Sequence, residues 1–399
     1  MSQPAAISNR RFLLTLAGGV MALLALGALF NFAVDPYASF RWGDIKGLND
    51  QKTLRRDGGR VNKALILGHT RFDALLYGTS RGEMGLDPQS PALGGAFAFN
   101  ASLSDTNIAE LARAVEYAAR HQSPELVVVG LDLLMFGEQV WTSGDFNRSG
   151  FAGASPWPVY ARRLLSLQAF DDSGWVLFSS VRHLRQSFAK DGTYDIGARK
   201  KTFDHRAEMD GVLRAQLAPT TSGKTYAGFH YAPERMEDLN RLLSAFDNGK
   251  TRVMLFVTPA HAKVLEAKAA AGLMPAWEQW KRDLALTVEM ANVNRRKPVE
   301  LWDFSGANPI TTEDIPHSPD NRMRWYWDGS HFTKAAGDLI LERMIAGKGD
   351  DSFGTRLSPD TVETVIGRIR DERARYVETH ADEVAQVRAL AERTGISRR

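Results

Sequence analysis

The longest apolar stretch of the chain lies near its N-terminus. From Phe12 to Val34 the chain runs for 23 residues without a charged side chain. A helix rises about 1.5 Å per residue, so this stretch would span roughly 34 Å and match the roughly 30 Å hydrocarbon core of a bilayer. No polar face interrupts the stretch, which disfavours a core helix of a soluble domain. The pattern therefore predicts a transmembrane helix over residues 12–34.

Two arginines, Arg10 and Arg11, stand directly before the apolar stretch. Such residues stay on the cytoplasmic side, which keeps residues 1–11 as a cytoplasmic tail and exports the rest of the chain. A cleaved signal peptide is the alternative, but its apolar region is normally about 7–15 residues long and is followed by a small-x-small site. The longer stretch here, which ends in Phe30-Asn31-Phe32, favours an uncleaved single-pass anchor.

Beyond the anchor, short apolar runs alternate with segments of helical periodicity. Strands that alternate with helices form βαβ units, so the expected fold is α/β with a doubly wound, mostly parallel sheet. Ligands bind beyond the carboxyl ends of the strands in such sheets. The predicted strands are Asp73–Tyr77, Ala96–Phe99, Leu126–Val129, Val253–Val257 and Val299–Trp302. The predicted helices are Asn107–His121, Trp277–Ala291, Thr333–Ile345 and Pro359–Arg393, the last of which is either one long helix or a helix pair.

The same pattern divides the chain into regions. Residues 35–70 are polar and irregular, which predicts a juxtamembrane linker, and the main domain is expected over residues 71–348. Within that domain, residues 136–233 are rich in aromatic and turn-forming residues and have weak periodicity. They indicate a large insertion of loops and helices that could form a lid or a substrate cleft. Residues 349–399 are expected to form a charged C-terminal helical extension whose apolar stripe requires a packing partner.

Composition narrows the function classes. The 399-residue chain has a formal net charge of +3 and a pI near 9.0 without a long run of lysine and arginine, so nucleic acid is not an expected partner. The absence of cysteine excludes disulfides, thiolate metal sites and cysteine nucleophiles. No cluster of histidines and carboxylates has the spacing of a metal site, so we expect no metal and no other bound cofactor.

Ser80 follows the first predicted strand, in the sequence Tyr77-Gly78-Thr79-Ser80-Arg81. A glycine-containing turn after a strand exposes the hydroxyl at the carboxyl edge of the sheet. A serine there can attack an acyl carbon, while amides at the start of the next helix stabilise the oxyanion. The other interpretation is a helix N-cap, which is the commoner use of a serine at a strand end.

An aspartate and a histidine stand three residues apart late in the chain, in the sequence Asp328-Gly329-Ser330-His331. One tight turn can hold both side chains, so that the carboxylate orients the imidazole. The other ring nitrogen is then free to act as a base toward a serine. The other interpretation is an Asx turn beside an exposed histidine.

Together the two motifs resemble those of the SGNH/GDSL superfamily of esterases and acyltransferases. Gly78-Thr79-Ser80 stands in place of the family's nucleophile block, and Asp328 to His331 stands in place of its late Asp-x-x-His block. Within the superfamily the chain is similar to membrane-anchored envelope proteins of the alginate O-acetyltransferase accessory and teichoic acid D-alanine transfer types. The resemblance spans roughly residues 35–345 and implies an SGNH-like domain with flavodoxin-like strand order. It is also carried by Asp35-Pro36-Tyr37, Gly85-Leu86-Asp87-Pro88, Val127 to Asp132 and Trp302 to Ser305.

The chain departs from the family where the resemblance implies the oxyanion donors. Asn100 and Ala101 are candidates for the glycine block, as is the pair Gly94-Gly95. The Asn of the family's Gly-x-Asn-Asp block is missing, and Asp132 stands near that place. A carboxylate would repel an oxyanion unless it were protonated or turned away, so Asp132 is expected to position substrate or to act structurally.

Arg81 and His261 are further candidates for substrate binding. Arg81 follows the serine and could contact an anionic substrate or form an ion pair at the start of its helix. His261 lies beyond the predicted strand Val253–Val257 and could line the cleft or cap a helix.

Three functions remain open from the sequence. The first is an O-acyltransferase that moves an acetyl or similar group onto a cell-surface glycan through a Ser80 acyl-enzyme, with His331 activating the acceptor hydroxyl. The resemblance implies a multi-spanning membrane acyltransferase as partner, and a place in the bacterial inner membrane with the main domain in the periplasm. The second is an esterase or deacetylase that uses water. The third is a catalytically degenerate domain that binds glycan or scaffolds an export complex.

Overall fold

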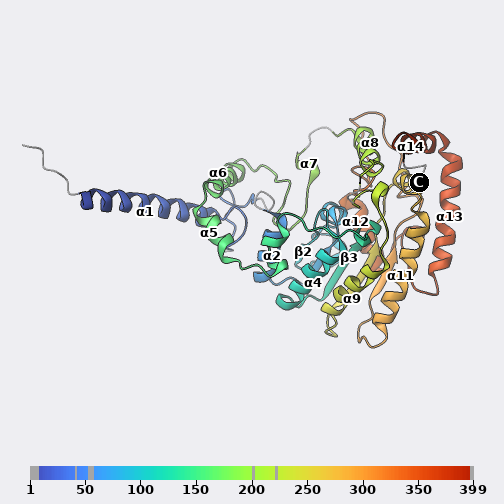
Figure 1. Ribbon diagram of the computed structural model, residues 1–399, viewed down its shortest axis with the longest axis horizontal. Coiled ribbons are helices and arrows are strands. Elements are labelled where there is room, and N and C mark those ends of the chain that lie inside the picture. Colours follow the sequence, from blue (N-terminus) through green and yellow to red (C-terminus); the bar gives the residue numbers. More distant parts are fainter. Residues whose placement is uncertain (1–8, 41–42, 53–57, 200–202, 221–222, 396–399) are drawn as a thin grey trace, which may run out of the picture.

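One long helix projects from an α/β domain in the computed structural model, which describes residues 9–40, 43–52, 58–199, 203–220 and 223–395 (Figure 1). The projecting helix, α1 (Asn9–Val34), is long and apolar enough to cross a membrane, and its most apolar window is wholly exposed. The predicted apolar helix is therefore confirmed, although a signal sequence would have the same length and composition. Residues 1–8 of the predicted tail lie outside the described part of the chain.

Six strands of the described chain form one mixed sheet in the order β2-β1-β3-β4-β5-β6. The first five strands in this order are parallel, and β6 pairs antiparallel with β5. The predicted α/β fold with a mostly parallel sheet is confirmed. The antiparallel edge strand was not expected, because two residues are too few to leave an alternating pattern. The strands are β1 (Ala74–Tyr77), β2 (Ala98–Asn100), β3 (Leu126–Leu131), β4 (Arg252–Val257), β5 (Glu300–Asp303) and β6 (Thr355–Arg356).

The parallel register brings the carboxyl ends of the central strands to one edge of the sheet. Tyr77 of β1 pairs with Val129 of β3, and Leu131 at the end of β3 pairs with Val257 at the end of β4. The side chains of these strands are almost all buried, as expected for a sheet covered on both faces. Residues that directly follow β1, β3 and β4 therefore emerge close together.

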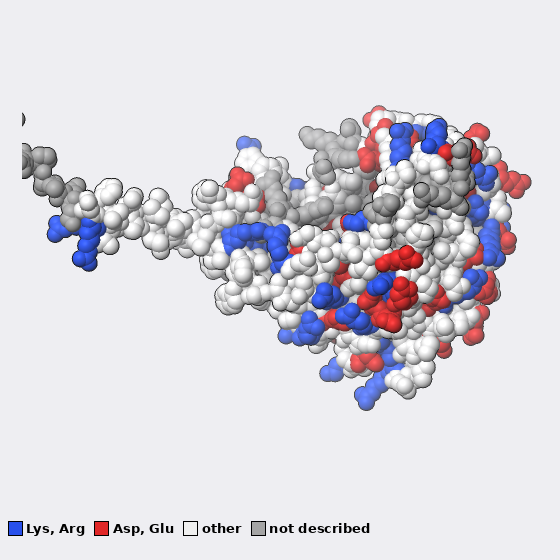
Figure 2. Space-filling model, in the orientation of Figure 1, with Lys and Arg blue, Asp and Glu red and all other residues white. Residues whose placement is uncertain are grey.

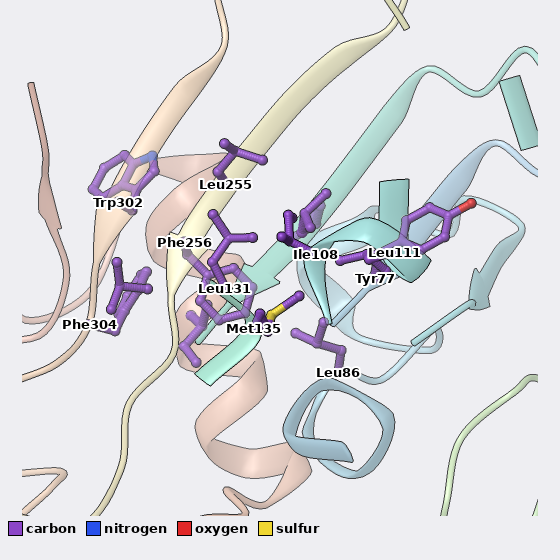
Figure 3. Packing of buried hydrophobic residues seen from close by; sticks show 14 of the residues in the cluster. Tyr77, Leu86, Ile108, Leu111, Leu131, Met135, Leu255, Phe256, Trp302 and Phe304 are labelled. Carbon is purple, nitrogen blue, oxygen red and sulfur yellow. The ribbon is translucent and has the colours of Figure 1, made fainter. Parts of the chain in front are cut away.

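Helices cover the sheet in two groups. In the first, α4 (Ile108–His121), α9 (Met236–Ala245) and α11 (Met274–Asn292) pack in a row. In the second, α12 (Lys334–Ala346) packs against α3 (Ser80–Gly85). Right-handed crossovers place the two groups on opposite faces of the sheet. Figure 3 shows side chains of β3, β4 and α4 meeting in the core between these layers, among them Leu131, Phe256, Ile108 and Leu111.

The prediction of an irregular linker over residues 35–70 is wrong for its second half. Residues Gly59–His69 form α2, which is buried over most of its length and packs against α4. Two of its buried positions are basic, and these residues, Arg60 and Lys63, pair with Glu110 and Glu83. A hydrophobicity pattern treats such positions as exposed, because unpaired charges are almost never buried. The helix is therefore part of the domain.

Residues 136–233, the expected insertion, contain helices, turns and isolated bridges in their described part. Helices α5 (Trp157–Leu165) and α6 (Leu167–Val181) pack against α1, whereas α8 (His205–Gln216) packs against α10 (Ala262–Ala270). The region thus packs at two separate places in the molecule, against α1 and against α10. That it is an insertion into a family fold stays a prediction. The remaining short helical elements of the region are η3 (Phe146–Arg148), η4 (Gly150–Ala152), α7 (Ile196–Arg199) and η5 (Tyr226–Gly228). Two more, η2 (Leu133–Phe136) and η6 (Pro233–Arg235), lie at its two borders, and η1 (Pro91–Leu93) precedes β2.

The charged C-terminal segment folds back onto the domain. Helix α13 (Val362–Thr379) packs against α11, and α14 (Ala381–Arg393) packs against α10. Arg373 of α13 forms two hydrogen bonds with the Glu266 carboxylate of α10, at 2.6 and 2.8 Å. The apolar stripe expected in this segment is buried at Val362, Ile366 and Ile369. The partner that the stripe requires is therefore the domain itself.

Candidate active site

Three side chains that lie far apart in the sequence form a hydrogen-bonded chain. Ser80 Oγ lies 2.9 Å from His331 Nε2, and His331 Nδ1 lies 2.7 Å from Asp328 Oδ2. With its Nδ1 proton directed at the carboxylate, the imidazole presents Nε2 as the acceptor of the serine proton. Asp328 is buried, and the His331 side chain remains 21% exposed. The structure thus brings together the residues that the two sequence motifs single out.

The turn after β1 leaves the Ser80 hydroxyl free of a capping role. Thr79 is the N-cap of α3, since its backbone is extended and its hydroxyl accepts a hydrogen bond from the Arg81 N–H at 3.4 Å. Ser80 is the first helical residue, so its hydroxyl is available to the imidazole. The turn is tight, because a Cβ on Gly78 would lie 3.3 Å from the Gly82 Cα. The N-cap of this motif is therefore Thr79 and not Ser80.

Asp328 uses its two carboxylate oxygens separately. Oδ1 accepts hydrogen bonds from the N–H groups of Ser330 and His331, at 2.7 and 2.8 Å, which forms an Asx turn. Oδ2 accepts from the His331 ring. Burial alone would raise the pKa of Asp328, but His331 and these hydrogen bonds outweigh burial and lower it. The Asx turn and the contact between carboxylate and imidazole thus coexist in one turn, and the catalytic role of the pair stays a prediction.

A second polar cluster ties together the ends of three strands beside Ser80. Arg81 Nη1 lies 2.6 Å from Asp132 Oδ1, and it also donates to the Thr258 hydroxyl at 2.9 Å. Asp132 further accepts from the hydroxyls of Thr79, at 2.7 Å, and of Thr258. The Asp132 charge is therefore compensated within the cluster. Of the two roles considered for Arg81, the ion pair is the one that the geometry realises.

A cavity of about 330 Å³ opens beside Ser80 and His331. The turns after β1 and β3 contribute Arg81 and Asp132 to its lining. Further walls come from the loop before α4, from η2, from residues 136–233 and from α10. They include Trp141, Val212, Gln216, Lys224, Tyr226 and Lys268.

The cavity lining contains more basic than acidic side chains. Two of its titratable groups, Lys268 and Tyr226, were not revealed by the sequence motifs. Burial lowers the pKa of Lys268 well below its ordinary value, and the charges of Arg81 and Lys281 lower it further. Burial also raises the pKa of Tyr226 to about 12, so its hydroxyl stays protonated and can donate. Both residues come from segments remote from either motif, so no pattern around them signals a site.

The donors of Asn100 and Ala101, the oxyanion candidates, are used within the fold. Both amide hydrogens of the Asn100 side chain are donated to main-chain carbonyls, those of Gly82 and Leu86, at 2.8 Å each. The Ala101 N–H donates to the Leu76 carbonyl at 2.7 Å. Neither residue lines the cavity. Asn100, at the end of β2, instead uses its side chain to hold α3 in place.

His261 caps α10. Its Nδ1 accepts from the Lys263 N–H at 3.2 Å, and its Nε2–H donates to the Glu313 carbonyl at 2.8 Å. The ring is buried, and burial lowers its pKa to about 4. His261 does not line the cavity. The capping role, rather than substrate binding, is the one that the structure assigns to it.

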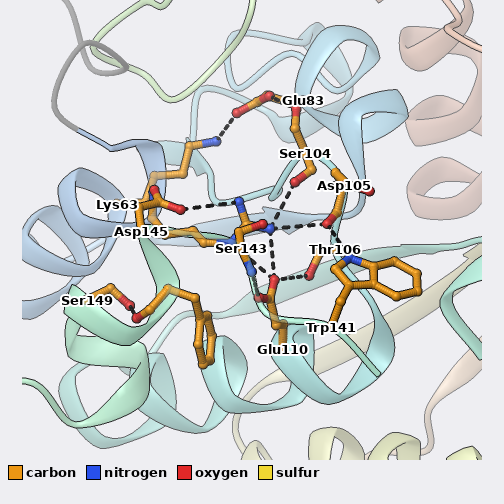
Figure 4. A network of polar contacts seen from close by, with 12 residues as sticks. Lys63, Glu83, Ser104, Asp105, Thr106, Glu110, Trp141, Ser143, Asp145 and Ser149 are labelled. Atoms are coloured by element: carbon orange, nitrogen blue, oxygen red, sulfur yellow. Dashed lines mark hydrogen bonds and ion pairs between the residues drawn. The ribbon is translucent and has the colours of Figure 1, made fainter. Parts of the chain in front are cut away.

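A buried ionic network holds α3 from the side of α2 (Figure 4). Lys63 Nζ lies 2.9 Å from Glu83 Oε1 and 2.6 Å from the Ser102 carbonyl oxygen. Arg60 Nη2 lies 2.8 Å from Glu110 Oε2. Another cavity, of about 360 Å³, lies over this network, and the charged groups lining it include Lys63, Glu83 and Arg60. The network therefore supports the helix that begins with Ser80.

Among the residues that the structure describes, no group of three or more His, Cys, Asp or Glu side chains is placed to hold a metal ion. No family model matches the chain, and neither a curated protein nor a solved structure matches it. The geometry around Ser80 is therefore the observation from which a function must be argued.

Proposed function

We propose that the protein is a membrane-anchored O-acyltransferase that transfers an acyl group, such as acetyl, to a hydroxyl of a cell-surface glycan. The observation that carries this proposal is the hydrogen-bonded chain from Ser80 Oγ through His331 to Asp328. A serine, a histidine and a buried carboxylate in this arrangement form the triad of acyl-transfer enzymes. The proposed site lies at the carboxyl edge of a mostly parallel sheet, where ligands of such folds bind.

The first half of the reaction forms an acyl-enzyme. His331 Nε2 takes the Ser80 proton as the serine oxygen attacks the carbonyl carbon of the acyl donor. The tetrahedral intermediate collapses, the bond to the donor's leaving group breaks, and His331 returns the proton to that leaving group. Asp328 holds the imidazole in the required tautomer and stabilises its charged form.

The second half transfers the acyl group to the acceptor. An acceptor hydroxyl gives its proton to His331 and attacks the acyl carbon, and the bond to Ser80 breaks. Ser80 then recovers the proton from His331. The oxyanion of both steps would form next to the first turn of α3, whose N–H groups lack intrahelical acceptors. Since Arg81 compensates the charge of Asp132, that carboxylate does not oppose the oxyanion as an unpaired charge would.

Two further features support an SGNH-like domain of this kind. The order β2-β1-β3-β4-β5 is the order of flavodoxin-like sheets. The nucleophile follows the first strand and the Asp-x-x-His turn precedes the last large helix, α12, of the sheet region. An anchor that keeps the domain at a membrane fits a donor delivered by a multi-spanning membrane acyltransferase, and periplasmic placement in a bacterial inner membrane fits a glycan acceptor.

Hydrolysis is the second candidate, because the same acyl-enzyme can be resolved by water. The partial exposure of His331 lets a water molecule reach the base. An esterase and a transferase would differ only in the nucleophile of the second step.

The proposal is tested with the full chain in detergent and a fluorescent phosphonate that reacts with activated serines. Labelling should occur on Ser80, vanish in Ser80→Ala and fall at least about 100-fold in rate in His331→Ala, because the base is lost. Ser244→Ala, at an exposed serine of α9, is the control and should label normally.

Absence of labelling and of ester turnover in the wild-type chain would overturn the proposal in favour of a glycan-binding or scaffold role. If labelling occurs, a glycan oligosaccharide is added with an aryl acetate donor. Acetylated oligosaccharide detected by mass spectrometry identifies a transferase, whereas release of free acetate alone identifies an esterase.

A further inference from the structure

Helix α6 buries mainly small and polar residues and exposes mainly large apolar residues. Its buried face carries Asp172, Ser173 and Ser180. Its exposed face carries one charged residue, Asp171, among apolar side chains at helical spacing: Leu167, Phe170, Trp175, Phe178 and Val181, of which Leu167 is 87% exposed. A helix on the surface of a soluble domain shows the reverse pattern, because its apolar face covers the core.

Helix α5 extends the same surface. Trp157 and Leu165 are exposed at its two ends, and Trp157 is 75% exposed. Arg162 within α5 and Arg182 after α6 are exposed as well. The apolar platform defined by α5 and α6 comprises Trp157, Leu165, Leu167, Phe170, Trp175, Phe178 and Val181. Contiguous exposed apolar surface of this kind marks an interaction site.

The apolar platform is continuous with the end of α1. Asn31 of α1 donates from Nδ2 to the Leu164 carbonyl at 2.9 Å and accepts at Oδ1 from the Ser173 hydroxyl at 3.0 Å. The rings of Phe30 and Phe170 lie 5.1 Å apart. The polar residues on the inner face of α6 therefore hold the last turn of α1, and the outer face is left apolar.

The contact with α1 fixes the depth of the apolar platform. Leu23 lies at the middle of the apolar stretch, so Phe30 would lie about 10 Å from the bilayer midplane if α1 spans it. The hydrocarbon core ends about 15 Å from the midplane. Phe170, which contacts Phe30, would then lie near the boundary between acyl chains and headgroups. Tryptophan and arginine side chains favour that boundary.

We infer that the apolar platform docks onto the surface of the same lipid bilayer that α1 crosses. Helices α5 and α6 lie along the interface, with their apolar side chains buried at the headgroup level, as amphipathic interfacial helices do. Figure 2 shows that acidic side chains gather mainly over the parts of the domain farther from α1, whereas most of the charged side chains beside α1 are basic. A domain held by one helix could rotate freely, whereas docking at a second place fixes its orientation to the membrane.

The absence of cysteine allows a direct test in the full chain. Single cysteines are introduced as Leu167→Cys and Val181→Cys at the ends of the α6 stripe, and as Leu23→Cys in α1. Val293→Cys is the matched control, because Val293 is an apolar residue that is 76% exposed beyond α11, away from α1. Each variant carries a nitroxide label and is reconstituted into vesicles of phosphatidylethanolamine and phosphatidylglycerol. The accessibility of each label to oxygen and to a water-soluble nickel chelate is then measured by electron paramagnetic resonance.

Labels at positions 167 and 181 should be more accessible to oxygen than to the nickel chelate, as the label at position 23 should be, and the label at position 293 should show the reverse. If position 23 lies in lipid while positions 167 and 181 behave like position 293, the apolar platform does not bind lipid and a protein partner must cover it. If position 23 itself is exposed to the chelate, α1 does not span the bilayer and the inference fails at its premise. Phosphonate labelling of Ser80 is independent of either outcome.

Discussion

The two carboxylate oxygens of Asp328 have separate roles, and a single substitution can remove one role and keep the other. Oδ1 holds the turn through two N–H groups, and Oδ2 holds the His331 ring. Asparagine keeps a carbonyl oxygen for the turn but presents an N–H group where the imidazole needs an acceptor. The turn and the tautomer of the histidine can therefore be tested apart.

We predict that Asp328→Asn lowers the rate of Ser80 labelling and ester turnover by about 10³–10⁴-fold, because the imidazole is forced into the wrong tautomer. The free energy of unfolding should change little, since the Asx turn survives. Asp320→Asn, at an exposed aspartate of the same region, is the control and should keep normal rates. A variant at position 328 that retained more than a tenth of the activity would contradict the proposed role of the carboxylate.

His261 makes the stability of the fold depend on pH. Burial holds the pKa of the folded ring at about 4, below the value near 6.5 of an unfolded histidine. Between these two values the unfolded chain binds more protons than the folded chain. Stability therefore falls as the pH drops from 6.5 toward 4, and the contribution of this residue amounts to about 3 kcal/mol.

Urea unfolding in detergent at several pH values measures this effect through tryptophan fluorescence. In His261→Asn the unfolding free energy should lose that part of its pH dependence, because asparagine can cap α10 without titrating. The variant should also be less stable at pH 7, since the main-chain carbonyl of Glu313 loses its hydrogen-bond donor. His317→Asn, at an exposed histidine, should leave the slope unchanged. If the unfolding free energy had the same pH dependence in wild type and in His261→Asn, the pH dependence could not be assigned to His261.

At the scale of elements, the position of α3 depends on a close approach to α12. A Cβ on Gly337 of α12 would lie 1.8 Å from the Gly85 carbonyl oxygen, which belongs to the last residue of α3. A Cβ on Gly85 would lie 2.1 Å from the Phe332 ring. The two helices meet through their backbones, so any side chain between them would push Ser80 away from His331.

Gly337→Ala should therefore destabilise the fold by about 3 kcal/mol and reduce Ser80 labelling, although the residue does not contact the serine. Gly367→Ala is the matched control, because that helical glycine of α13 has open space around its Cβ position. It should stabilise the chain by about 0.5–1 kcal/mol through helix propensity. The urea midpoints of the two variants should move in opposite directions, and a shift of the Gly337→Ala midpoint in the stabilising direction would refute the close packing of α3 and α12.

The bounds predicted for the central strands differ from the observed bounds by at most two residues, because strands covered on both faces are apolar throughout. It missed α2, whose buried Arg60 and Lys63 depend on acids from α4 and α3 that no local pattern reveals. It also treated Asn100 as a donor to substrate, but strand geometry turns that side chain toward α3. The two sequence motifs were enough to identify Ser80, Asp328 and His331 as candidate site residues. Lys268 and Tyr226 reach the cavity through tertiary packing alone, so no motif identified them.

At the scale of the whole molecule, α1 is joined to the domain rather than merely preceding it. Its last turn buries Asn31 and Val34, and Tyr37 just beyond it donates to Asp172 at 2.5 Å. A cleaved signal sequence would not contribute buried contacts of this kind to the mature domain. We therefore expect α1 to be retained in the mature protein.

We predict that the protein purified from membranes retains α1. Intact-mass spectrometry should give a mass that includes residues 12–34, and the chain should stay in the membrane pellet after alkaline carbonate extraction. Asn31→Leu, which removes both hydrogen bonds but keeps the apolar stretch, should remain membrane-bound and lower the thermal midpoint of the domain. A mature mass that begins beyond Val34 would contradict this prediction.

The two edges of the sheet limit how copies of this protein can associate. The edge strands, β2 and β6, have three and two residues. On β2 the Asn100 N–H is already taken by the Asp191 carbonyl, at 2.9 Å. Long open edges invite a strand from another chain and lead to fibrillar aggregation, and short or covered edges prevent this. Copies of this domain can therefore approach one another without their sheets joining, and we expect any specific assembly to be made through helices or loops rather than through the sheet.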